Sequence, residues 1–507
     1  MKILADFVLN DNRQRSGCKH IIFRKDSRND KSIKRVRIRR LRKSQNGKPL
    51  LRDFELIADT AVAEPCPLYE EYGSENFLML LFWKSCPQIV VDKVVKSGLW
   101  VRVEDEASKT LYKFFGHSPT QLRNRHCVFY STDLEKRYNT TQRNTTLKKA
   151  MQAQTTLSPY EQLISRFGKF NMKNVAKKAS RIGLLLSTAK PVVSINDTQV
   201  DRIADVENDK FNFTDGCGLI SPDIAAQITG YPFQYQYEQQ VHKFPSVYQI
   251  RFKGCKGILM LDTTLVNKIA LRQSMIKFEW NSEKTVNPLR IVEDGNAVSF
   301  PNVYSCINLQ FIRLLSALGV PDEAFLTKLG TYFEELSRIM HDQEVQVRFL
   351  CAYKRYDLAE RILTTSSVDD ETLKQLKHYQ ITCQLKKPRT SQSKDKIEAE
   401  KPNKIKVKFP LDQSRLVFGV ADTTGKLEYG CCYFQPTIRG KPTVLEGFRV
   451  IVCKSPSYHV GDVRVLECVN IPECKHLVDC LVFPVKGQWC MRLFSLIKFH
   501  PNRAMDS

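Results

Sequence analysis

The sequence predicts an α+β protein in which two β-rich blocks flank a block of helices. Its 507 residues suffice for roughly two to four domains, and a composition of 42% hydrophobic and 26% charged residues is typical of a folded chain. Strand-like runs dominate residues 151–310 and return from residue 409, whereas apolar residues at helical spacing fill the stretch between them. Strands and helices segregated in this way favour α+β over a doubly wound α/β sheet.

The chain is strongly basic, and half of the surplus charge lies near its start. The formal net charge is +24, and residues 1–50 contribute +12, from sixteen Lys and Arg against four Asp. The densest run is Lys34–Lys43. Such a surplus indicates a polyanionic partner, either nucleic acid or an acidic membrane face. We expect residues 1–50 to form a basic arm, which is either simply solvated or serves nuclear import or nucleic-acid binding.

Hydropathy indicates an intracellular, soluble protein. The start, Met1–Asp6, has no apolar segment before its first acid, which argues against a secretory signal. The longest apolar run, Phe77–Trp83, is far shorter than the ~20 residues that span a bilayer. We expect this run to be a buried strand or helix turn.

The cysteines suggest neither a disulfide scaffold nor a common zinc module. Sixteen cysteines are scattered over the chain and no Cys-x-x-Cys occurs, so we expect them to be reduced and mostly buried. The densest group has spacings that fit no common zinc module, and it consists of Cys453, Cys468, Cys474, Cys480 and Cys490 with His459 and His476.

The order of elements follows from local patterns. Residues 51–150 form an N-terminal mixed α/β region with strand-like pieces such as Gly98–Val103. The next region, residues 151–310, opens with a helical stretch over Asn174–Leu186, and strand-like runs separated by glycines follow.

The second half of the chain changes pattern three times. Residues 311–383 are predicted to be helical, with Pro321-Asp322-Glu323 as one favourable first turn and a second helix starting at Ser367. Residues 384–408 are rich in Lys, Ser and Pro, which predicts a basic linker. From residue 409 to 507, strand and turn patterns return.

Four blocks stand out as candidates for chemistry. Phe213–Ser221 contains Asp-Gly-x-Gly, which is typical of a tight turn. Tyr248–Asp262 has two strand-like halves around Gly-Cys-Lys-Gly, with basic side chains along it, and Leu271–Phe278 carries two more. Lysines on rigid strands suit phosphate binding, and arginines clamp phosphates bidentately, although composition alone favours ordinary solvated strands.

The fourth block is His459–Glu467, which His-Leu-Val-Asp and Val-Phe-Pro-Val-Lys-Gly follow. His459 and Asp462 suggest an acid/base or metal pair, but a turn that leads into a strand is the simpler interpretation.

Taken together, these blocks resemble the eukaryotic cellular RNA-directed RNA polymerases, the enzymes that make double-stranded RNA in RNA silencing. The matches occur in the right order, from Phe-Thr-Asp-Gly-Cys-Gly-Leu-Ile-Ser through Gln-Ile-Arg-Phe-Lys-Gly-Cys-Lys-Gly and Arg-Gln-Ser-Met-Ile-Lys-Phe to Gly-Asp-Val-Arg-Val-Leu-Glu. Weaker matches include Tyr112–Ser118 and Lys178–Gly183. The resemblance covers roughly residues 105–487.

The resemblance implies a core of two double-psi β-barrels with a helical insert between them. It places the first barrel in residues 151–310 and a partial second, catalytic barrel in residues 409–507. Lys256 and Lys277 match the family's motif lysines, so the resemblance assigns them to nucleotide phosphate or RNA contact, with Arg251 and Arg272 as lesser candidates. Such a cationic clamp offsets the negative charge that builds up on the transferring phosphoryl group.

The resemblance also implies a Mg²⁺ ion, held by an Asp-x-Asp-Gly-Asp loop of the second barrel. This sequence contains no Asp-x-Asp. Gln488–Lys498 looks foreign to the family pattern, and Phe499–Arg503 resembles the run that precedes the loop. We therefore expect a C-terminally truncated form with no catalytic residue and no metal ligand in this chain, inactive unaided.

The expected family function is RNA synthesis on an RNA template, giving double-stranded RNA for siRNA production. The expected partners are the RNA template and nucleoside triphosphates, with silencing-pathway proteins as further candidates and no membrane. The expected location is the nucleus or the cytoplasm. The alternatives are a non-catalytic RNA-binding or scaffold protein derived from the polymerase fold, and a basic structural protein of an RNA particle.

Overall fold

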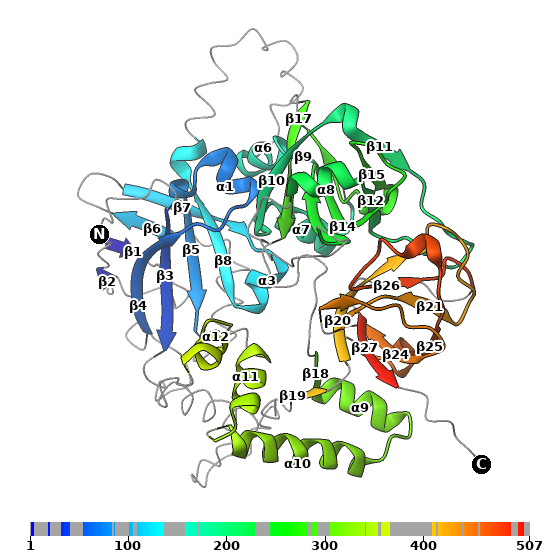
Figure 1. The fold of residues 1–507 in the computed structure, drawn as a ribbon. Helices are drawn as coiled ribbons and strands as arrows, with labels where there is room; N and C mark the ends of the chain where they lie inside the picture. Colours follow the sequence, from blue (N-terminus) through cyan, green and yellow to red (C-terminus); the bar gives the residue numbers. More distant parts are fainter. Residues whose placement is uncertain are drawn as a thin grey trace. The chain divides into compact units, whose positions relative to one another are not determined.

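The structure is a computed structural model (Figure 1), which describes the following residues: 2–4, 19–20, 32–40, 54–83, 86, 101–104, 109–135, 158–170, 172–228, 244–281, 285–292, 305–339, 341–352, 356–365, 408–411, 414–438, 440–454, 457–487 and 495–500. The chain divides into two compact units. Unit 1 comprises Met1–Val200, Gln249–Gly257 and Met275–Ala297, and unit 2 comprises Asp201–Tyr248, Ile258–Ser274 and Val298–Ser507.

Unit 1 contains an eight-stranded sheet with the strand order β2-β1-β6-β7-β8-β5-β3-β4. The strands are β1 Lys2–Leu4, β2 Lys19–His20, β3 Ser32–Arg40, β4 Phe54–Val62, β5 Phe77–Phe82, β6 Val101–Glu104, β7 Lys109–Gly116 and β8 His126–Ser131. Strand β5 pairs with β3 in parallel and with β8 antiparallel, so the apolar run that contains it is a buried strand, as predicted.

The densest basic run is not part of a solvated arm. Residues 32–40 form β3, which lies between β4 and β5, and Ile33, Val36 and Ile38 of this strand are buried. Arg35 and Arg37 both contact the Asp59 carboxylate of β4, at 3.0 and 2.7 Å. The prediction of a basic arm is therefore wrong for residues 32–40, because the apolar residues between the arginines bury one side of the strand.

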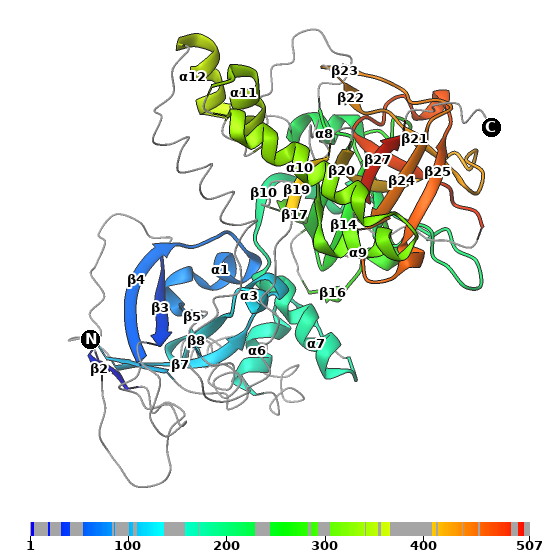
Figure 2. The same cartoon turned by 90° about the horizontal axis from the view of Figure 1, so that it is seen from below.

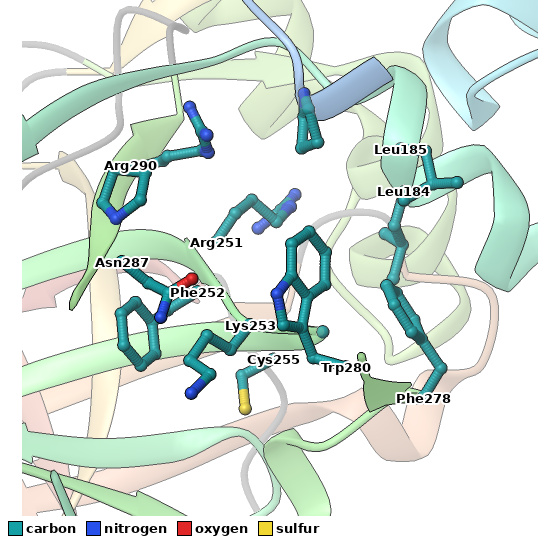
Figure 3. A pocket seen from close by; sticks show the side chains of 13 residues that line it. Leu184, Leu185, Arg251, Phe252, Lys253, Cys255, Phe278, Trp280, Asn287 and Arg290 are labelled. Atoms are coloured by element: carbon teal, nitrogen blue, oxygen red, sulfur yellow. The ribbon is translucent and has the colours of Figure 1, made fainter. Parts of the chain in front are cut away.

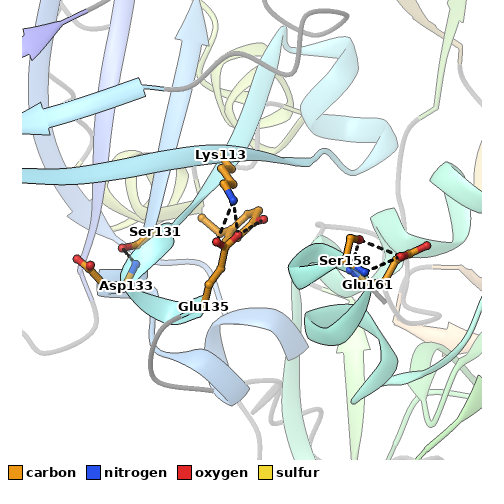
Figure 4. Close-up of polar contacts among 7 residues, drawn as sticks. Lys113, Ser131, Asp133, Glu135, Ser158 and Glu161 are labelled. Carbon is orange, nitrogen blue, oxygen red and sulfur yellow. Dashed lines mark hydrogen bonds and ion pairs between the residues drawn. The ribbon is translucent and has the colours of Figure 1, made fainter. Parts of the chain in front are cut away.

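Unit 1 also contains short helices, and several of them start with a side-chain cap. They are α1 Pro67–Tyr72, α3 Pro119–Arg123, α6 Pro159–Ser165 and α7 Val175–Ile182, with 3₁₀ turns η2 Ser74–Asn76, η4 Gly183–Leu186 and η5 Asp197–Gln199. Ser118 and Ser158 each form a capping box with the residue three positions on, the latter with Glu161 (Figure 4). Strand β7 leads directly into the cap at Ser118, so the weaker family match at Tyr112–Ser118 corresponds to a strand and the turn after it.

Aromatic and aliphatic side chains form the core of unit 1. The cluster joins α1, β5, α6 and η4, and its buried members include Tyr72, Phe77, Phe115, Phe167 and Leu185. Burial of each large apolar side chain contributes about 1.5–3 kcal/mol. At its edge, the Lys113 ammonium contacts both oxygens of the Glu135 carboxylate at 2.8 Å, and the Tyr130 hydroxyl donates to the same carboxylate (Figure 4).

A second group of strands carries the first three sequence blocks that are candidates for chemistry. In unit 1, β10 Ala189–Asn196 pairs with β17 Val286–Val292, which pairs with β13 Val247–Phe252, and β9 Gly168–Lys169 pairs with β16 Glu279–Trp280. In unit 2, β12 Cys217–Ile220 lies between β14 Cys255–Leu261 and β15 Ile269–Arg272. Strands β13 and β14 each cross from one unit to the other. Strand β11 Val200–Ile203, α8 Pro222–Ile228 and η6 Gln273–Met275 complete this region.

Further along the chain, unit 2 contains the helices α9 Leu309–Ala317, α10 Asp322–Arg338, α11 Gln343–Ala352 and α12 Tyr356–Thr365 (Figure 2). Helix α10 begins after Pro321, as its acidic first turn predicted. Phe311, Leu315 and Leu336 pack with Cys453 and Val463 of the neighbouring strands. Strands β18 Ser305–Asn308 and β19 Lys408–Leu411 pair antiparallel. The second predicted helix start, at Ser367, and nearly all of the predicted linker lie outside the described residues.

A closed barrel forms the last part of unit 2, in the order β20-β26-β21-β25-β24-β27. Its strands are β20 Ser414–Ala421, β21 Cys431–Phe434, β24 Arg449–Lys454, β25 Val463–Cys468, β26 Cys480–Phe483 and β27 Ser495–His500. A hairpin of β22 Thr437–Ile438 and β23 Lys441–Pro442, with turns η7 Val460–Asp462 and η8 Pro472–Cys474, lies between them. The barrel was predicted to be partial, but β27 pairs with both β20 and β24 and closes it.

Among the cysteines whose side chains the structure describes, none forms a disulfide, Cys431 is partly exposed and the others are buried. Within the described part of the chain, no helix is long and apolar enough to cross a membrane.

Candidate functional site

The candidate site is built on the hairpin of β13 and β14. Only Lys253 and Gly254 connect the two strands, and both have positive φ, 41° and 74°, as a two-residue hairpin turn requires. Gly254 also permits a close approach, because a Cβ atom there would lie 2.3 Å from the Phe278 carbonyl oxygen. The turn therefore lies earlier than the Gly-Cys-Lys-Gly segment suggested, and Lys256 lies within β14.

The hairpin places cations in a row. Since the turn has two residues, Arg251 and Lys256 are cross-strand neighbours, and Arg251 pairs with Arg290 of β17 on its other side (Figure 3). Arg290 is neutralised by Glu70, whose carboxylate oxygens lie 2.7 and 2.6 Å from its guanidinium.

Lys277 joins the same site from the segment after η6. Its backbone N–H donates to the Gly254 carbonyl at 3.0 Å, and the adjacent Ile276 forms a bridge with Cys255. Two sequence blocks that are separated along the chain thus meet in unit 1, and they bring Lys256 and Lys277 together.

Lys256 is the most perturbed of these groups. Burial, followed by the positive charges of Arg251, Lys277 and Arg181, lowers the pKa of its ammonium to about 8. We call Arg181, Arg251, Lys256 and Lys277 the cation cluster. A cluster of like charges is unfavourable by itself, and an anion bound beside it would offset the repulsion.

Arg181 is a member that sequence reasoning did not single out as a site residue. It lies on α7, which is capped by the Asn174 side chain and is strongly amphipathic. The only signal was its position in the weaker Lys178–Gly183 match, because a helix surface rich in Lys and Arg is otherwise typical of simple solvation.

Arg272 belongs to unit 2, whereas the cation cluster belongs to unit 1. Its side chain is 6% exposed, and it donates to the backbone carbonyls of Cys217, at 2.8 Å, and Ala204. These bonds hold the Asp-Gly-Cys-Gly turn. Sequence reasoning grouped Arg272 with the lysines because it could not show which way the guanidinium turns.

A polar network supports the same turn. Asp205 accepts hydrogen bonds from the Ser274 N–H at 2.8 Å, the Ser274 hydroxyl at 2.6 Å and the Thr214 hydroxyl at 3.1 Å. The Ser274 hydroxyl in turn accepts the Gly216 N–H at 3.0 Å. The motif serine therefore ties two of the sequence blocks together.

The side chains of His459 and Asp462, in the fourth sequence block, are held by local contacts. The Nδ1 atom of His459 accepts the Gly461 N–H at 2.9 Å, while Asp462 binds the Lys454 ammonium at 2.7 Å. The interpretation of this block as a turn into a strand is confirmed. No group of three or more His, Cys, Asp or Glu side chains among the described residues could hold a metal ion.

Comparison with known proteins agrees with this arrangement of motifs. The family model described as "RNA dependent RNA polymerase" matches residues 61–492. The chain belongs to the RNA-dependent RNA polymerase family. It is 31% identical over 408 residues to the Probable RNA-dependent RNA polymerase SHL2 of Oryza sativa subsp. japonica, a match that covers 74% of this chain and 29% of that protein.

Two further polymerases extend this result. RNA-dependent RNA polymerase 6 of Arabidopsis thaliana is 31% identical over 396 residues, which are 74% of this chain and 29% of that protein. The solved structure of the RNA dependent RNA polymerase QDE-1 from Thielavia terrestris matches with a TM-score of 0.62 at 15% identity, over 93% of this chain and 53% of that one. This likeness shows a shared polymerase fold. The chain spans less than a third of the length of the two plant relatives.

Proposed function

We propose that this chain carries the phosphate-binding surface of an enzyme that copies an RNA template into double-stranded RNA for RNA silencing. The observation that carries the proposal is the cation cluster, in which Lys256 and Lys277 from two family motifs lie with Arg251 and Arg181 around one site. In this proposal, Lys256 and Lys277 contact nucleotide or RNA phosphates, and Arg251 assists. Arg272 is left out, because its guanidinium is buried against backbone carbonyls.

The chemistry follows from charge. A triphosphate carries several negative charges, and the cluster offers cations that are partly withdrawn from water, where each charge-assisted hydrogen bond contributes about 1.5–3 kcal/mol. When a phosphate binds, it offsets the repulsion between the cations and favours the charged form of Lys256. The cluster would thus bind the phosphates and hold them in place for transfer.

Polymerases of this family are expected to use Mg²⁺ for the transfer step, and the described residues of this chain do not fit that ion. The sequence has no Asp-x-Asp, and no described cluster of carboxylates could hold a cation. We therefore assign phosphate binding to this chain and no metal-dependent step.

We further propose a double-psi arrangement for the barrels. The closed barrel combines parallel pairs, β20 with β26 and β21 with β25, with antiparallel ones, and this mixture supports the assignment of residues 409–507 to the second barrel. Residues 151–310 would form the first barrel region, 311–383 the helical insert and 384–408 the linker. RNA template and nucleoside triphosphates are the proposed partners, in the nucleus or the cytoplasm.

The test is triphosphate binding by the 507-residue chain. Lys256→Met and Lys277→Met should each weaken the affinity for inorganic triphosphate and for UTP at least tenfold, measured by calorimetry. Lys169→Met is the matched control, because Lys169 is an exposed lysine of unit 1 that pairs only loosely with Glu279, at 3.8 Å. It should keep the wild-type affinity.

A different result would favour the alternative of a non-catalytic RNA-binding or scaffold protein. If both cluster variants bind triphosphate as tightly as the wild type while the chain still binds RNA, the phosphate assignment is wrong.

A further inference from the structure

Two cysteine side chains meet inside the closed barrel of unit 2. Cys432 lies on β21 and Cys468 on β25, and the two residues are direct partners in the parallel pairing of these strands. Their Sγ atoms are 3.6 Å apart, although 36 positions separate the residues in the chain. The fold alone brings these thiols together, so no short spacing in the sequence indicates the pair.

The backbone geometry at this pair suits a covalent bond. Neighbouring strands of a sheet lie about 4.8 Å apart, and a disulfide joins residues whose Cα atoms are roughly 4.4–6.8 Å apart. The sulfur atoms of a disulfide are about 2.05 Å apart, so the two Sγ atoms would have to approach by about 1.5 Å. Rotation of the two side chains supplies an approach of this size without separating the strands.

The surroundings keep the pair reduced at rest. Both side chains are 0% exposed, and they pack in the barrel core with residues such as Val450 and Leu481. The hydrogen bond with Cys468 and burial raise the pKa of the Cys432 thiol well above its ordinary value. Because the thiolate is the reactive form of cysteine, oxidation of this pair should be slow and should require a small oxidant.

A peroxide meets this requirement, because hydrogen peroxide is not much larger than water and can enter when the barrel opens locally. In the first step, one thiol attacks the peroxide: an S–O bond forms, the O–O bond breaks, and one water leaves. In the second step, the other thiol attacks the sulfenic sulfur: the S–S bond forms, the S–O bond breaks, and a second water leaves. Two thiols and one peroxide thus give one disulfide and two waters.

The bond would lie where the pairing of the barrel strands is short. Strand β21 pairs with β25 only through Cys431 and Cys432, and with β26 through Tyr433 and Phe434. Strand β24, by contrast, pairs with β25 along most of its length. A disulfide would therefore hold β21 in the barrel by a covalent bond, and it would also restrict the unfolded chain by closing a loop.

We propose that Cys432 and Cys468 are an oxidation site, at which a peroxide forms a reversible disulfide that joins β21 to β25 and stabilises the barrel. This inference goes beyond the proposed function and does not depend on it, because the cation cluster belongs to unit 1 and the cysteine pair to unit 2.

Peptide mapping of the 507-residue chain tests the bond. The folded protein is treated with hydrogen peroxide, remaining thiols are capped with N-ethylmaleimide, and the chain is digested with trypsin without reductant. Residues 427–439, which contain Cys432, should be joined to residues 465–475, which contain Cys468. Treatment with dithiothreitol before capping should separate the two peptides.

Variants locate the bond, because each of these peptides contains two cysteines. Cys432→Ala and Cys468→Ala should each abolish the joined peptides. Cys431→Ala is the matched control and should keep them, since Cys431 is the partly exposed neighbour on the same strand and pairs with Glu467. Cys474→Ala, in the second peptide, should keep them as well.

Thermal unfolding tests the effect on the barrel. Peroxide treatment should raise the unfolding midpoint of the wild type by about 5 °C, and dithiothreitol should reverse the rise. Cys432→Ala should show no such rise, and its cooperative unfolding before treatment shows that this variant is folded.

Three results would overturn the inference. The first is that the wild type gives no joined peptides while Cys431 is oxidised, which shows that the peroxide was active. The second is that the joined peptides appear only in urea, where the chain is unfolded, or disappear in Cys431→Ala. The third is that the bond forms but leaves the unfolding midpoint unchanged, which would refute its stabilising role.

Discussion

Replacing Lys256 with methionine should stabilise the fold and weaken phosphate binding at the same time. Methionine keeps most of the apolar length of the lysine side chain and removes only its charge. In the native state, burial and the neighbouring charges of Arg251, Lys277 and Arg181 lower the pKa of Lys256 to about 8. The charged form is therefore disfavoured in the folded protein relative to the unfolded chain.

The size and sign of the effect follow from linkage. The fall in pKa from 10.5 to about 8 corresponds, at about 1.36 kcal/mol per pH unit, to an upper limit of about 3.4 kcal/mol. Lys256 is only partly buried, so solvent screening reduces this to about 1–2 kcal/mol. The penalty is fully present below pH 8, where the lysine is charged in both states, and it fades as the pH rises towards 10.5.

The assay is urea unfolding followed by tryptophan fluorescence at pH 7 and at pH 10.5. Lys256→Met should raise the free energy of unfolding by about 1–2 kcal/mol at pH 7 and by almost nothing at pH 10.5. Lys253→Met on the same hairpin is the control with the opposite sign, because it removes the ion pair with Asp197 and should lower that free energy by up to about 1 kcal/mol. The reasoning is refuted if Lys256→Met destabilises the protein at pH 7 as much as Lys253→Met does.

Three further predictions follow from the same geometry. Triphosphate binding should weaken up to tenfold per pH unit above pH 8, as Lys256 loses its proton, and calorimetry should find no such slope in Lys256→Met. Gly254→Ala should lower the free energy of unfolding by about 2–4 kcal/mol, since its φ is 74° and its Cβ would meet the Phe278 carbonyl oxygen. Gly330 in α10 has open space around it, so Gly330→Ala should raise that free energy by about 0.5–1 kcal/mol, and urea titrations measure both changes. Asp205→Ala should lower the free energy of unfolding by about 2–3 kcal/mol, because it leaves three hydrogen-bond donors without their acceptor; an unchanged urea midpoint would contradict this.

Local patterns predicted the elements whose signals are local. The helix from Asn174, the strand at the apolar run from Phe77 and the helix after Pro321 all form as predicted, because capping, apolar spacing and a fixed proline φ act within a few residues. The strand pattern after residue 430 was also correct, as β21 shows. The motifs indicated the polymerase family by themselves, because a set of short blocks in a fixed order is a property of the chain alone.

Local sequence patterns did not predict the strands that form only by pairing with segments distant in the chain. The run around Arg35 is dense in charge, and as an isolated segment it would be solvated. It becomes β3 because strands on both sides supply hydrogen bonds and because Asp59 neutralises its arginines. Closure of the barrel by β27 depends in the same way on pairing with β20 and β24, which are distant in sequence.

The sequence by itself determined the α+β class, the order of the elements and which lysines to examine, since residue types and spacing are written in the chain. Only the tertiary structure decided what these residues do to one another. It turned Arg272 inward to backbone carbonyls, brought Arg181 towards Lys256 and placed Cys432 against Cys468 in the barrel. Burial and charge repulsion depend on distances through space, and those distances exist only once the chain is folded.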